Sequence, residues 1–376
     1  MKASAETPLI LEARRGARRF VVLVEGSLGV LDAKTAAVLL RYAPESVAAL
    51  LDSTRAGQTA QDALGYGGGV PIVATLAEAM PHEPDALLVG IAPVGGLMPA
   101  AWRAVLIEAL DKGLDVWAGL HSFLADDPEL AARARANGRA LVDLRRVPAT
   151  LPVAAARVRE VAAKVVLTVG SDCNVGKMTA AWEIAREFTA RGKSAAFVAT
   201  GQTGILLAGR GLAVDRVVSD FVAGAAEALV LDAAREHDWV IVEGQGSIVH
   251  PGYAGVTLGL LLGALPSAMV LCHQPRRTEI RHGGVPIPPL SDLVRRYEDA
   301  LAPIRPGKVV ALALNTFDLD DAAAQRAVDA SARATGLPAT DVVRFGAAKI
   351  VDALVKHPFP QPTLQTSAER SGEDAP

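Results

Sequence analysis

The stretch "VVLTVGSDCNVGKMTAAW", from Val165 to Trp182, joins an apolar run, a glycine-containing loop and the start of an amphipathic pattern. The apolar run ends at Gly170, and apolar residues recur with helical spacing after Lys177. A strand, a glycine loop and a helix N-terminus in this order form a phosphate cradle, because backbone N–H groups converge and the lysine reaches phosphate oxygens. The stretch therefore predicts a strand–loop–helix unit of an α/β domain with an anion-binding loop.

The loop departs from the strict pattern G-x-x-x-x-G-K-[ST] in two ways. Five residues separate Gly170 from Gly176, and Met178 stands where a hydroxyl should follow Lys177, with Thr179 one position later. In magnesium-dependent phosphoryl transfer that hydroxyl holds the metal, so the loop favours phosphate binding over nucleotide hydrolysis. The alternative is a glycine-rich turn with a solvated lysine. The cofactor-binding candidates are Gly170, Ser171, Asp172, Cys173, Asn174, Val175, Gly176, Lys177, Met178 and Thr179.

Composition limits the class of protein. The 376 residues are 51% hydrophobic but only 4% aromatic, which favours aliphatic α/β layers over an aromatic-rich β-sandwich. A net charge of −3 gives no basic excess for a nucleic-acid partner. Two cysteines exclude a disulfide framework, and we find neither a leader pattern nor the roughly 18 uninterrupted apolar residues of a membrane span. We expect a soluble, cytoplasmic protein without a membrane partner.

Strand-like runs and helical patterns alternate along the chain in two series. The first series includes "RRFVVLVEG", "SVAALLD" and "DALLVGIAP", and the second includes "KVVLTVG", "SAAFVAT" and "DWVIVEG". This rhythm predicts an α/β protein with two doubly wound parallel-sheet domains. We place the domains at residues 1–150 and 151–360, and we expect the Pro-rich, polar residues 361–376 to be a disordered tail.

The segment "DWVIVEGQGSIVHPGYAG" supplies two candidate catalytic residues. Glu243 ends an apolar strand, where an acid on a neighbouring strand faces the cradle loop in related folds. His250 follows in the same loop and is a candidate acid or base. The alternatives are a solvated turn acid for Glu243 and a structural loop histidine for His250.

Two further loops carry the candidate substrate-binding residues. Arginines take carboxylates as bidentate partners, and small polar residues after a strand are typical of substrate loops. Ordinary glycine turns with surface charge are the alternative. The candidates are Gln202, Thr203, Arg210, Arg216, Asp220, Arg276 and Arg277.

Cysteine, histidine and asparagine residues near these loops leave alternatives open. The spacing of Cys272, His273 and His282 fits no compact zinc pattern, so no metal site is predicted. Cys173 is either a loop filler or a thiol activated by the helix N-terminus. Asn315 ends a strand and either reads an adenine edge or caps the strand.

Several long segments resemble the DgcN-type D-glutamate N-acetyltransferase family. They include "GSDCNVGKMTAAWE", "TGQTGILLAGRGLAVDRVVSDFVAGAAE", "VEGQGSIVHPGYAG" and "TGLPATDVVRFG", and the likeness extends over nearly all of residues 20–350. The resemblance implies a Rossmann-like N-terminal domain joined to a P-loop NTPase-like domain similar to dethiobiotin synthetase. It also implies acetyl transfer from acetyl-CoA to the amine of D-glutamate, and a functional partner enzyme of the enolase superfamily. We further expect a homo-oligomer, the usual state of such enzymes.

These expectations combine into one mechanistic hypothesis. Lys177 and the backbone amides of residues 173–178 hold the phosphates of CoA, and Glu243 or His250 removes the amine proton. Substrate carboxylates are held by one or more of Arg210, Arg216, Arg276 and Arg277.

Two other classes of protein fit the same motifs. An ATP- and magnesium-dependent ligase or kinase would use Lys177 for the β- and γ-phosphates, with Thr179 and Glu243 positioning Mg²⁺. A non-catalytic nucleotide sensor would bind the nucleotide without turnover.

Overall fold

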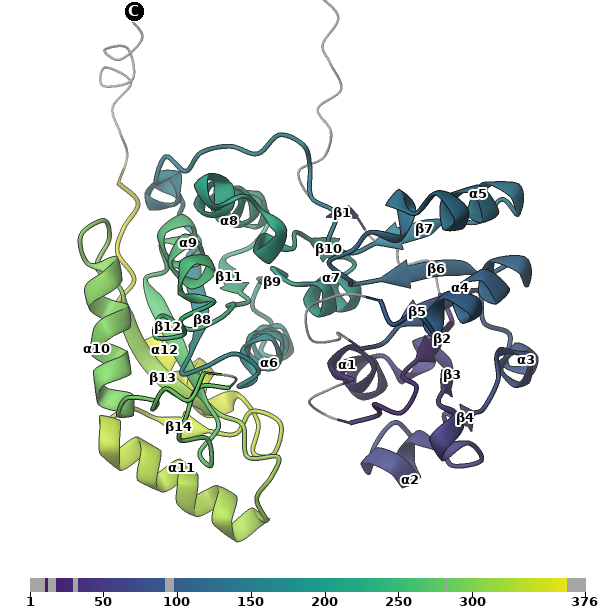
Figure 1. Cartoon of the computed structure of the whole chain (residues 1–376). Coiled ribbons are helices and arrows are strands. Elements are labelled where there is room, and N and C mark those ends of the chain that lie inside the picture. Colours follow the sequence, from purple (N-terminus) through teal and green to yellow (C-terminus); the bar gives the residue numbers. More distant parts are fainter. Residues whose placement is uncertain (1–10, 13–17, 30–32, 92–97, 282, 364–376) are drawn as a thin grey trace, which may run out of the picture. The chain divides into compact units, whose positions relative to one another are not determined.

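The computed structural model describes residues 11–12, 18–29, 33–91, 98–281 and 283–363. The chain divides into two compact units, each built around a six-stranded parallel sheet (Figure 1). One unit comprises residues 1–9, 148–201 and 217–376, and the other comprises residues 10–147 and 202–216. Most of the predicted tail, residues 364–376, lies outside the described residues. Within the described ranges, no helix is both long and apolar enough to cross a membrane.

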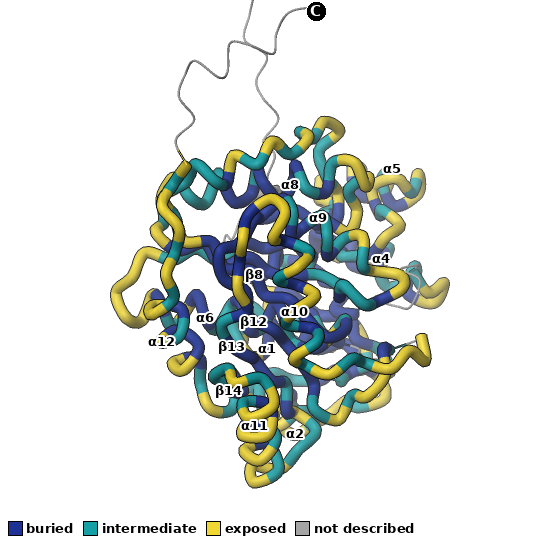
Figure 2. The backbone as a smooth tube through the Cα atoms, turned by 90° about the vertical axis from the view of Figure 1, so that its left-hand side faces the viewer, coloured by how far each residue is buried: buried dark blue, intermediate teal, exposed yellow. Residues whose placement is uncertain are grey.

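The first unit contains the cradle loop and is called the P-loop unit below. Its strands are β8 (Lys164–Gly170), β9 (Ala195–Val198), β11 (Trp239–Val242), β12 (Ala268–His273), β13 (Lys308–Leu314) and β14 (Ala339–Thr340). They pair in the order β14-β13-β12-β8-β11-β9, and every neighbouring pair is parallel. β8 lies inside the sheet with both faces covered, which explains its continuous apolar run (Figure 2).

Helices cover the sheet of the P-loop unit in two groups. They are α6 (Lys177–Ala190), α8 (Ser219–Ala233), α9 (Ala254–Ala264), α10 (Leu290–Leu301), α11 (Asp321–Thr335) and α12 (Ala348–Lys356). α6 contacts α12 and shares one buried hydrophobic cluster with it and the sheet. α9 contacts both α8 and α10. This arrangement confirms the predicted doubly wound fold.

Glycines allow α8 and α9 to pack at very short distance. A Cβ atom added at Gly263 would overlap the carbonyl oxygen of Ala223, and one added at Gly259 would overlap Val222. By contrast, the space around Gly255 in the same helix is open. The helix contact therefore requires glycine at two of these three positions, which lie one turn apart.

The second unit has the strand order of a Rossmann-like sheet and is called the Rossmann unit below. Its strands are β2 (Phe20–Leu23), β3 (Val47–Leu51), β4 (Ile72–Val73), β5 (Ala86–Val89), β6 (Asp115–Ala118) and β7 (Leu141–Asp143). Its helices include α1 (Lys34–Tyr42), α2 (Ala60–Leu64), α3 (Leu76–Ala79), α4 (Trp102–Asp111) and α5 (Pro128–Ala136). The order β4-β3-β2-β5-β6-β7 corresponds to the doubly wound order 3-2-1-4-5-6.

The short edge strands β4 and β14 were not predicted from the sequence. Each contains two residues, so neither produces the longer apolar run by which the longer strands were found.

Residues 202–216 fold with the Rossmann unit, although β9 of the other unit directly precedes them. They form α7 (Gln202–Ala208) and β10 (Arg210–Gly211), and β10 pairs antiparallel with β1 (Leu11–Glu12). The Thr203 hydroxyl shares a 3.0 Å hydrogen bond with Thr35, and Asp215 forms an ion pair with Arg145. The candidate residues in this segment therefore belong to a different unit from the cradle loop. The boundaries at residues 150 and 360 stay predictions.

Candidate anion-binding site

The cradle loop, residues 170–176, has the backbone shape that converging N–H groups require. Gly176 caps α6 with φ 98°, and Asn174 also has a positive φ of 54°. Left-handed backbone is unstrained for glycine and tolerated by asparagine. The loop thus turns sharply onto the N-terminus of a 14-residue helix, where the helix dipole favours an anion.

Lys177 and Met178 point in different directions at the start of α6. The Lys177 ammonium donates a 2.7 Å hydrogen bond to the Asp172 carbonyl oxygen and lies against the loop. Met178 is 2% exposed and contributes to the core of the unit. Because an apolar side chain occupies the position of the metal-binding hydroxyl, this residue offers Mg²⁺ no oxygen ligand.

Glu243 directly follows β11, and the next residue, Gly244, lies beside Lys177. Its carboxylate accepts hydrogen bonds from the Thr200 amide at 3.0 Å and from Gln245 Nε2 at 3.1 Å. The next residue, Gly244, packs so closely that an added Cβ would lie 3.3 Å from Lys177 Cδ and would overlap a backbone carbonyl of β8. The geometry brings Glu243 to the cradle loop, and its chemical role stays a prediction.

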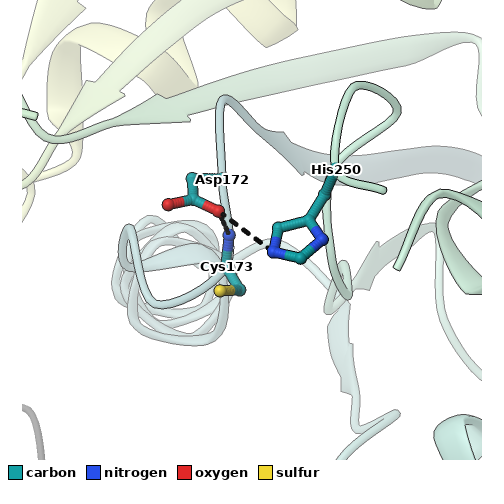
Figure 3. Close-up of side chains that lie close together, drawn as sticks. All are labelled: Asp172, Cys173 and His250. Carbon is teal, nitrogen blue, oxygen red and sulfur yellow. Dashed lines mark hydrogen bonds and ion pairs between the residues drawn. The ribbon is translucent and has the colours of Figure 1, made fainter. Parts of the chain in front are cut away.

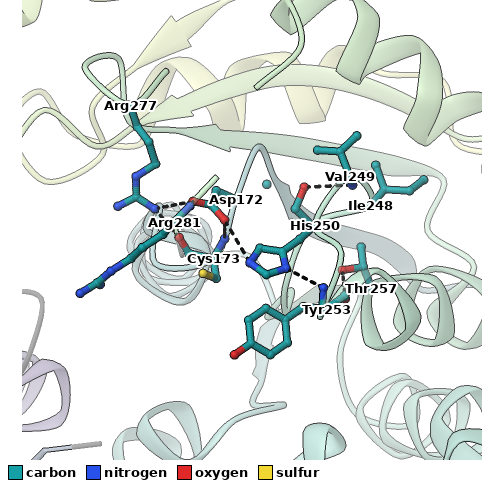
Figure 4. A network of polar contacts seen from close by, with 12 residues as sticks. Asp172, Cys173, Ile248, Val249, His250, Tyr253, Thr257, Arg277 and Arg281 are labelled. Atoms are coloured by element: carbon teal, nitrogen blue, oxygen red, sulfur yellow. Dashed lines mark hydrogen bonds and ion pairs between the residues drawn. The ribbon is translucent and has the colours of Figure 1, made fainter. Parts of the chain in front are cut away.

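Asp172 is a buried carboxylate on which three loops converge (Figure 4). Its Oδ2 accepts hydrogen bonds from Arg277 Nη1 at 2.9 Å and from the Arg281 amide at 2.8 Å. Its Oδ1 accepts from the Cys173 amide at 2.7 Å and lies 3.8 Å from His250 Nε2 (Figure 3). Residues from the loops after β8, β11 and β12 therefore meet at one carboxylate. The sequence placed Asp172 in the cradle loop, but no sequence pattern indicated that its carboxylate would hold three loops together.

The group formed by Asp172, Cys173 and His250 does not favour a metal ion. One ligand atom from each residue lies within 4.8 Å of the others. However, the Gly252 amide donates a 3.0 Å hydrogen bond to His250 Nδ1, so the proton of the neutral ring is on Nε2. Nε2 thus has no lone pair for a cation in this orientation, and the Arg277 guanidinium already neutralises Asp172.

The thiol of Cys173 is not activated by its position near the helix. Burial and the neighbouring Asp172 carboxylate raise the pKa of Cys173, and these effects exceed the opposing influence of Lys177 and Arg277. Of the two alternatives for Cys173, the structure favours a loop filler over a nucleophile. Cys272 is fully buried at the end of β12, and burial raises its pKa to about 12.

His273, the last residue of β12, is a buried neighbour of the cradle loop. Its Nδ1 lies 2.9 Å from the Ser171 hydroxyl. Burial, assisted by the Arg277 charge, lowers the pKa of His273 to about 4. The pair therefore holds Ser171 with a neutral imidazole at neutral pH. His282, the other histidine of this segment, lies outside the described residues.

We expect His273 to make the protein less stable in mild acid. The unfolded chain takes up a proton near pH 6.5 and the folded chain only near pH 4, so the free energy of unfolding falls as pH falls between these values. The contribution is about 2 kcal/mol between pH 7 and pH 5. His273→Asn retains an acceptor for Ser171 without this titration. Urea unfolding at pH 7 and pH 5 should show a smaller loss in the free energy of unfolding for the variant than for the wild type. Equal losses would contradict the lowered pKa of His273.

The side chain of Tyr297, in α10, forms hydrogen bonds with the start of the cradle loop and with the loop after β11. Its fully buried hydroxyl donates to the Gly170 carbonyl at 2.7 Å and accepts from the Ile248 amide at 3.0 Å. Burial raises the pKa of Tyr297. The amphipathic pattern of α10 places this residue in the core but gives no sign of its hydroxyl contacts, because both partners are distant in sequence.

Removal of this hydroxyl should destabilise the protein measurably. Tyr297→Phe leaves a buried carbonyl and a partly buried amide without their shared partner, which costs about 1–3 kcal/mol. Tyr253→Phe is the control, since the Tyr253 side chain is half exposed and its variant should unfold like the wild type. Guanidinium unfolding of the three proteins measures the difference. A Tyr297→Phe variant as stable as the Tyr253 variant would show that the hydroxyl does not brace the loops.

The structure separates the candidate substrate-binding residues into two sets. In the P-loop unit, Arg277 is engaged by Asp172, Arg276 is exposed, and Asp220 is exposed in the first turn of α8. Asn315 lies against the cradle, since its Cβ would be 3.6 Å from a Cβ added at Gly176. The set in the Rossmann unit comprises Gln202, Thr203, Arg210 and Arg216.

Two of the residues in the Rossmann unit have packing roles. Thr203 is buried against Thr35. Arg216 is exposed, and its guanidinium lies 5.0 Å from the ring centre of Phe123. No role in substrate binding follows from these contacts alone.

A Rossmann-like sheet and a P-loop sheet with an anion cradle define the class of protein. The chain belongs to the DUF1611 family: residues 152–351 match its P-loop domain and residues 53–147 match its Rossmann-like domain, both described as domains of unknown function. A crystal structure of a DUF1611 family protein from Anabaena variabilis is 39% identical and has a TM-score of 0.87. It matches 90% of this chain and 100% of that chain.

Two relatives carry a functional name. A protein named D-glutamate N-acetyltransferase from Tritonibacter scottomollicae is 41% identical over 288 residues, which cover 74% of this chain and 84% of the relative. A protein of the same name from a Pseudoalteromonas species is 34% identical over 281 residues, covering 74% and 83%. These findings confirm the family resemblance predicted from the sequence.

Proposed function

We propose that this protein is an N-acetyltransferase that transfers an acetyl group from acetyl-CoA to the amine of D-glutamate. The observation that carries the proposal is the 41% identity to a D-glutamate N-acetyltransferase over most of both chains. The cradle loop supports the choice of donor, because CoA carries phosphates that such a loop binds. A small-molecule substrate agrees with the absence of a strong net charge.

The reaction places two demands on the protein. The C–S bond of the thioester breaks and an amide C–N bond forms, while the ammonium of the acceptor loses two protons, of which one ends on the CoA thiol and the other passes to solvent. A base has to remove a proton from the ammonium, and donors have to stabilise the developing oxyanion. We assign the base to Glu243, which is buried beside the cradle loop. A Glu243→Gln variant that keeps the full rate would remove Glu243 from this role.

Binding without nucleotide hydrolysis is supported by the start of α6. Lys177 and the amides of residues 173–178 are assigned to the phosphates of CoA, and Asn315 to its adenine edge. Met178 is buried and offers no hydroxyl to Mg²⁺. An ATP-dependent ligase would have to hold the metal through other groups.

The carboxylates of D-glutamate are assigned to arginine side chains, which bind carboxylates with two parallel hydrogen bonds. Arg276 is exposed in the loop after β12, whereas Arg277 is held by Asp172. We therefore favour Arg276 over Arg277 as a substrate ligand, and we keep Arg210 and Arg216 of the Rossmann unit as candidates.

The test is acetyl transfer without ATP or magnesium. Purified protein is mixed with acetyl-CoA and D-glutamate, and free CoA thiol is measured over time, with L-glutamate in a parallel reaction. Thiol release that requires D-glutamate is the expected result. No release, combined with ADP formation once Mg-ATP and an acceptor are supplied, would overturn the proposal in favour of an ATP-dependent enzyme. Tight nucleotide binding without any turnover would favour a sensor.

A further inference from the structure

His250 carries a buried hydrogen-bond donor for which the structure provides no acceptor. The residue is 8% exposed, and its Nε2 is buried without a hydrogen-bond partner among the described residues. The Gly252 amide donates to Nδ1, so Nε2 bears the proton of the neutral ring. A buried donor that makes no hydrogen bond is unfavourable, so a state in which it finds an acceptor is stabilised.

The nearest acceptor is the Oδ1 atom of Asp172, and it is slightly too distant. The separation is 3.8 Å, about 1 Å beyond the usual hydrogen-bond length. Figure 3 shows the ring edge pointing at this carboxylate. Asp172 belongs to the cradle loop, whereas His250 belongs to the loop after β11. A small inward movement of the cradle loop would close the gap and join the two loops.

We propose that His250 is a positioning residue that donates its Nε2 proton to Asp172 when the cradle loop closes on an anion. This inference rests on the proposed function only in naming CoA as the anion. It gives His250 a role different from the base considered from the sequence, because a ring with its proton on Nε2 has no free lone pair directed at the site. The ligand gains affinity because its binding is coupled to a hydrogen bond that the 3.8 Å separation leaves unmade.

The electrostatic surroundings agree with a neutral donor. Asp172 already accepts from the Arg277 guanidinium and from two backbone amides, so its carboxylate is balanced before His250 reaches it. Lys177 adds a second positive charge beside the loop, at the Asp172 carbonyl. The remaining lone pairs of Oδ1 are free to accept one more neutral N–H donor.

The experiment compares three replacements of His250. Gln places an amide N–H where Nε2 stands, Asn places it near Nδ1, and Ala has no donor. Isothermal titration with CoA should give affinities within about threefold of wild type for His250→Gln, and about tenfold weaker for His250→Asn and His250→Ala. With acetyl-CoA as the varied substrate, the loss should appear in KM more than in kcat.

Two outcomes would overturn the inference. The first is equal CoA affinity for all variants, which would mean that the donor does not hold the loop. The second is a fall of at least about 100-fold in kcat for all three variants together with loss of the acidic limb of the pH–rate profile, which is the signature of a base. ADP serves as a second binding probe. A wild-type protein that binds ADP but neither binds nor uses CoA would contradict the proposed function while the same variant series still tests His250.

Discussion

Gly263→Ala should destabilise the P-loop unit by at least about 3 kcal/mol. The added Cβ would overlap the Ala223 carbonyl oxygen of α8 and would lie 2.8 Å from the Cα and carbonyl carbon of the same residue. All three are backbone atoms, so no side-chain rotation relieves the overlap and the two helices have to separate. The better helix propensity of alanine offsets only about 1 kcal/mol of this cost.

Gly255→Ala is the matched control for this prediction. It makes the same substitution in the same helix, two turns earlier, where nothing lies within 4 Å of the added Cβ. We expect it to raise the stability by about 0.5–1 kcal/mol, because alanine restricts the unfolded chain and favours the helix. Calorimetry of both variants should therefore give shifts of opposite sign. Shifts of the same sign would contradict the packing described for α8 and α9.

Lys177→Met should lower kcat/KM for acetyl-CoA by about 100-fold or more. Methionine retains the apolar stem that packs against Gly244 but removes the ammonium that lies in the cradle loop. A charged donor to a phosphate is among the stronger hydrogen bonds in proteins, and Lys177 is itself only 6% exposed. Thiol release and CoA titration measure the loss of turnover and the loss of affinity separately.

The control for this prediction removes a lysine charge elsewhere. Lys193→Met changes an exposed lysine in the turn after α6 and should leave turnover and CoA affinity unchanged. If Lys177→Met retained wild-type kcat/KM, the anion would not be held by this loop, and the assignment of the cofactor site would be wrong. If it bound CoA normally but lost turnover, Lys177 would act on the reacting group.

The longer strands, the order of domains and the family were accessible from the sequence. β8, β11, β12 and β13 are buried on both faces, and burial on both faces produces continuous apolar runs that are visible without a structure. The cradle loop was equally visible, because glycine spacing and an invariant order of strand, loop and helix are local properties. The two-residue strands β4 and β14 escaped notice, since their partners rather than their composition define them.

The contacts that organise the site were not accessible in the same way. Asp172 meets Arg277 across 105 residues of sequence, and Tyr297 meets Gly170 across 127. Such pairs leave no periodic signal in one chain. The candidates Gln202, Thr203, Arg210 and Arg216 follow a strand of the P-loop sheet in the chain, yet their segment folds with the Rossmann unit through Thr35 and Arg145.

The sequence by itself determined most of the elements and the cradle loop as a candidate anion site, because strands, helices and this loop depend on residues that are neighbours in the chain. Only the tertiary structure decided which side chains surround the loop and in which protonation state they act. In the fold, residues of three loops contact the Asp172 carboxylate. The Gly252 amide donates to Nδ1 of His250, which leaves Nε2 as the donor of the neutral ring. Hydrogen-bond partners fix the position of a proton, and those partners are brought together only when the chain folds.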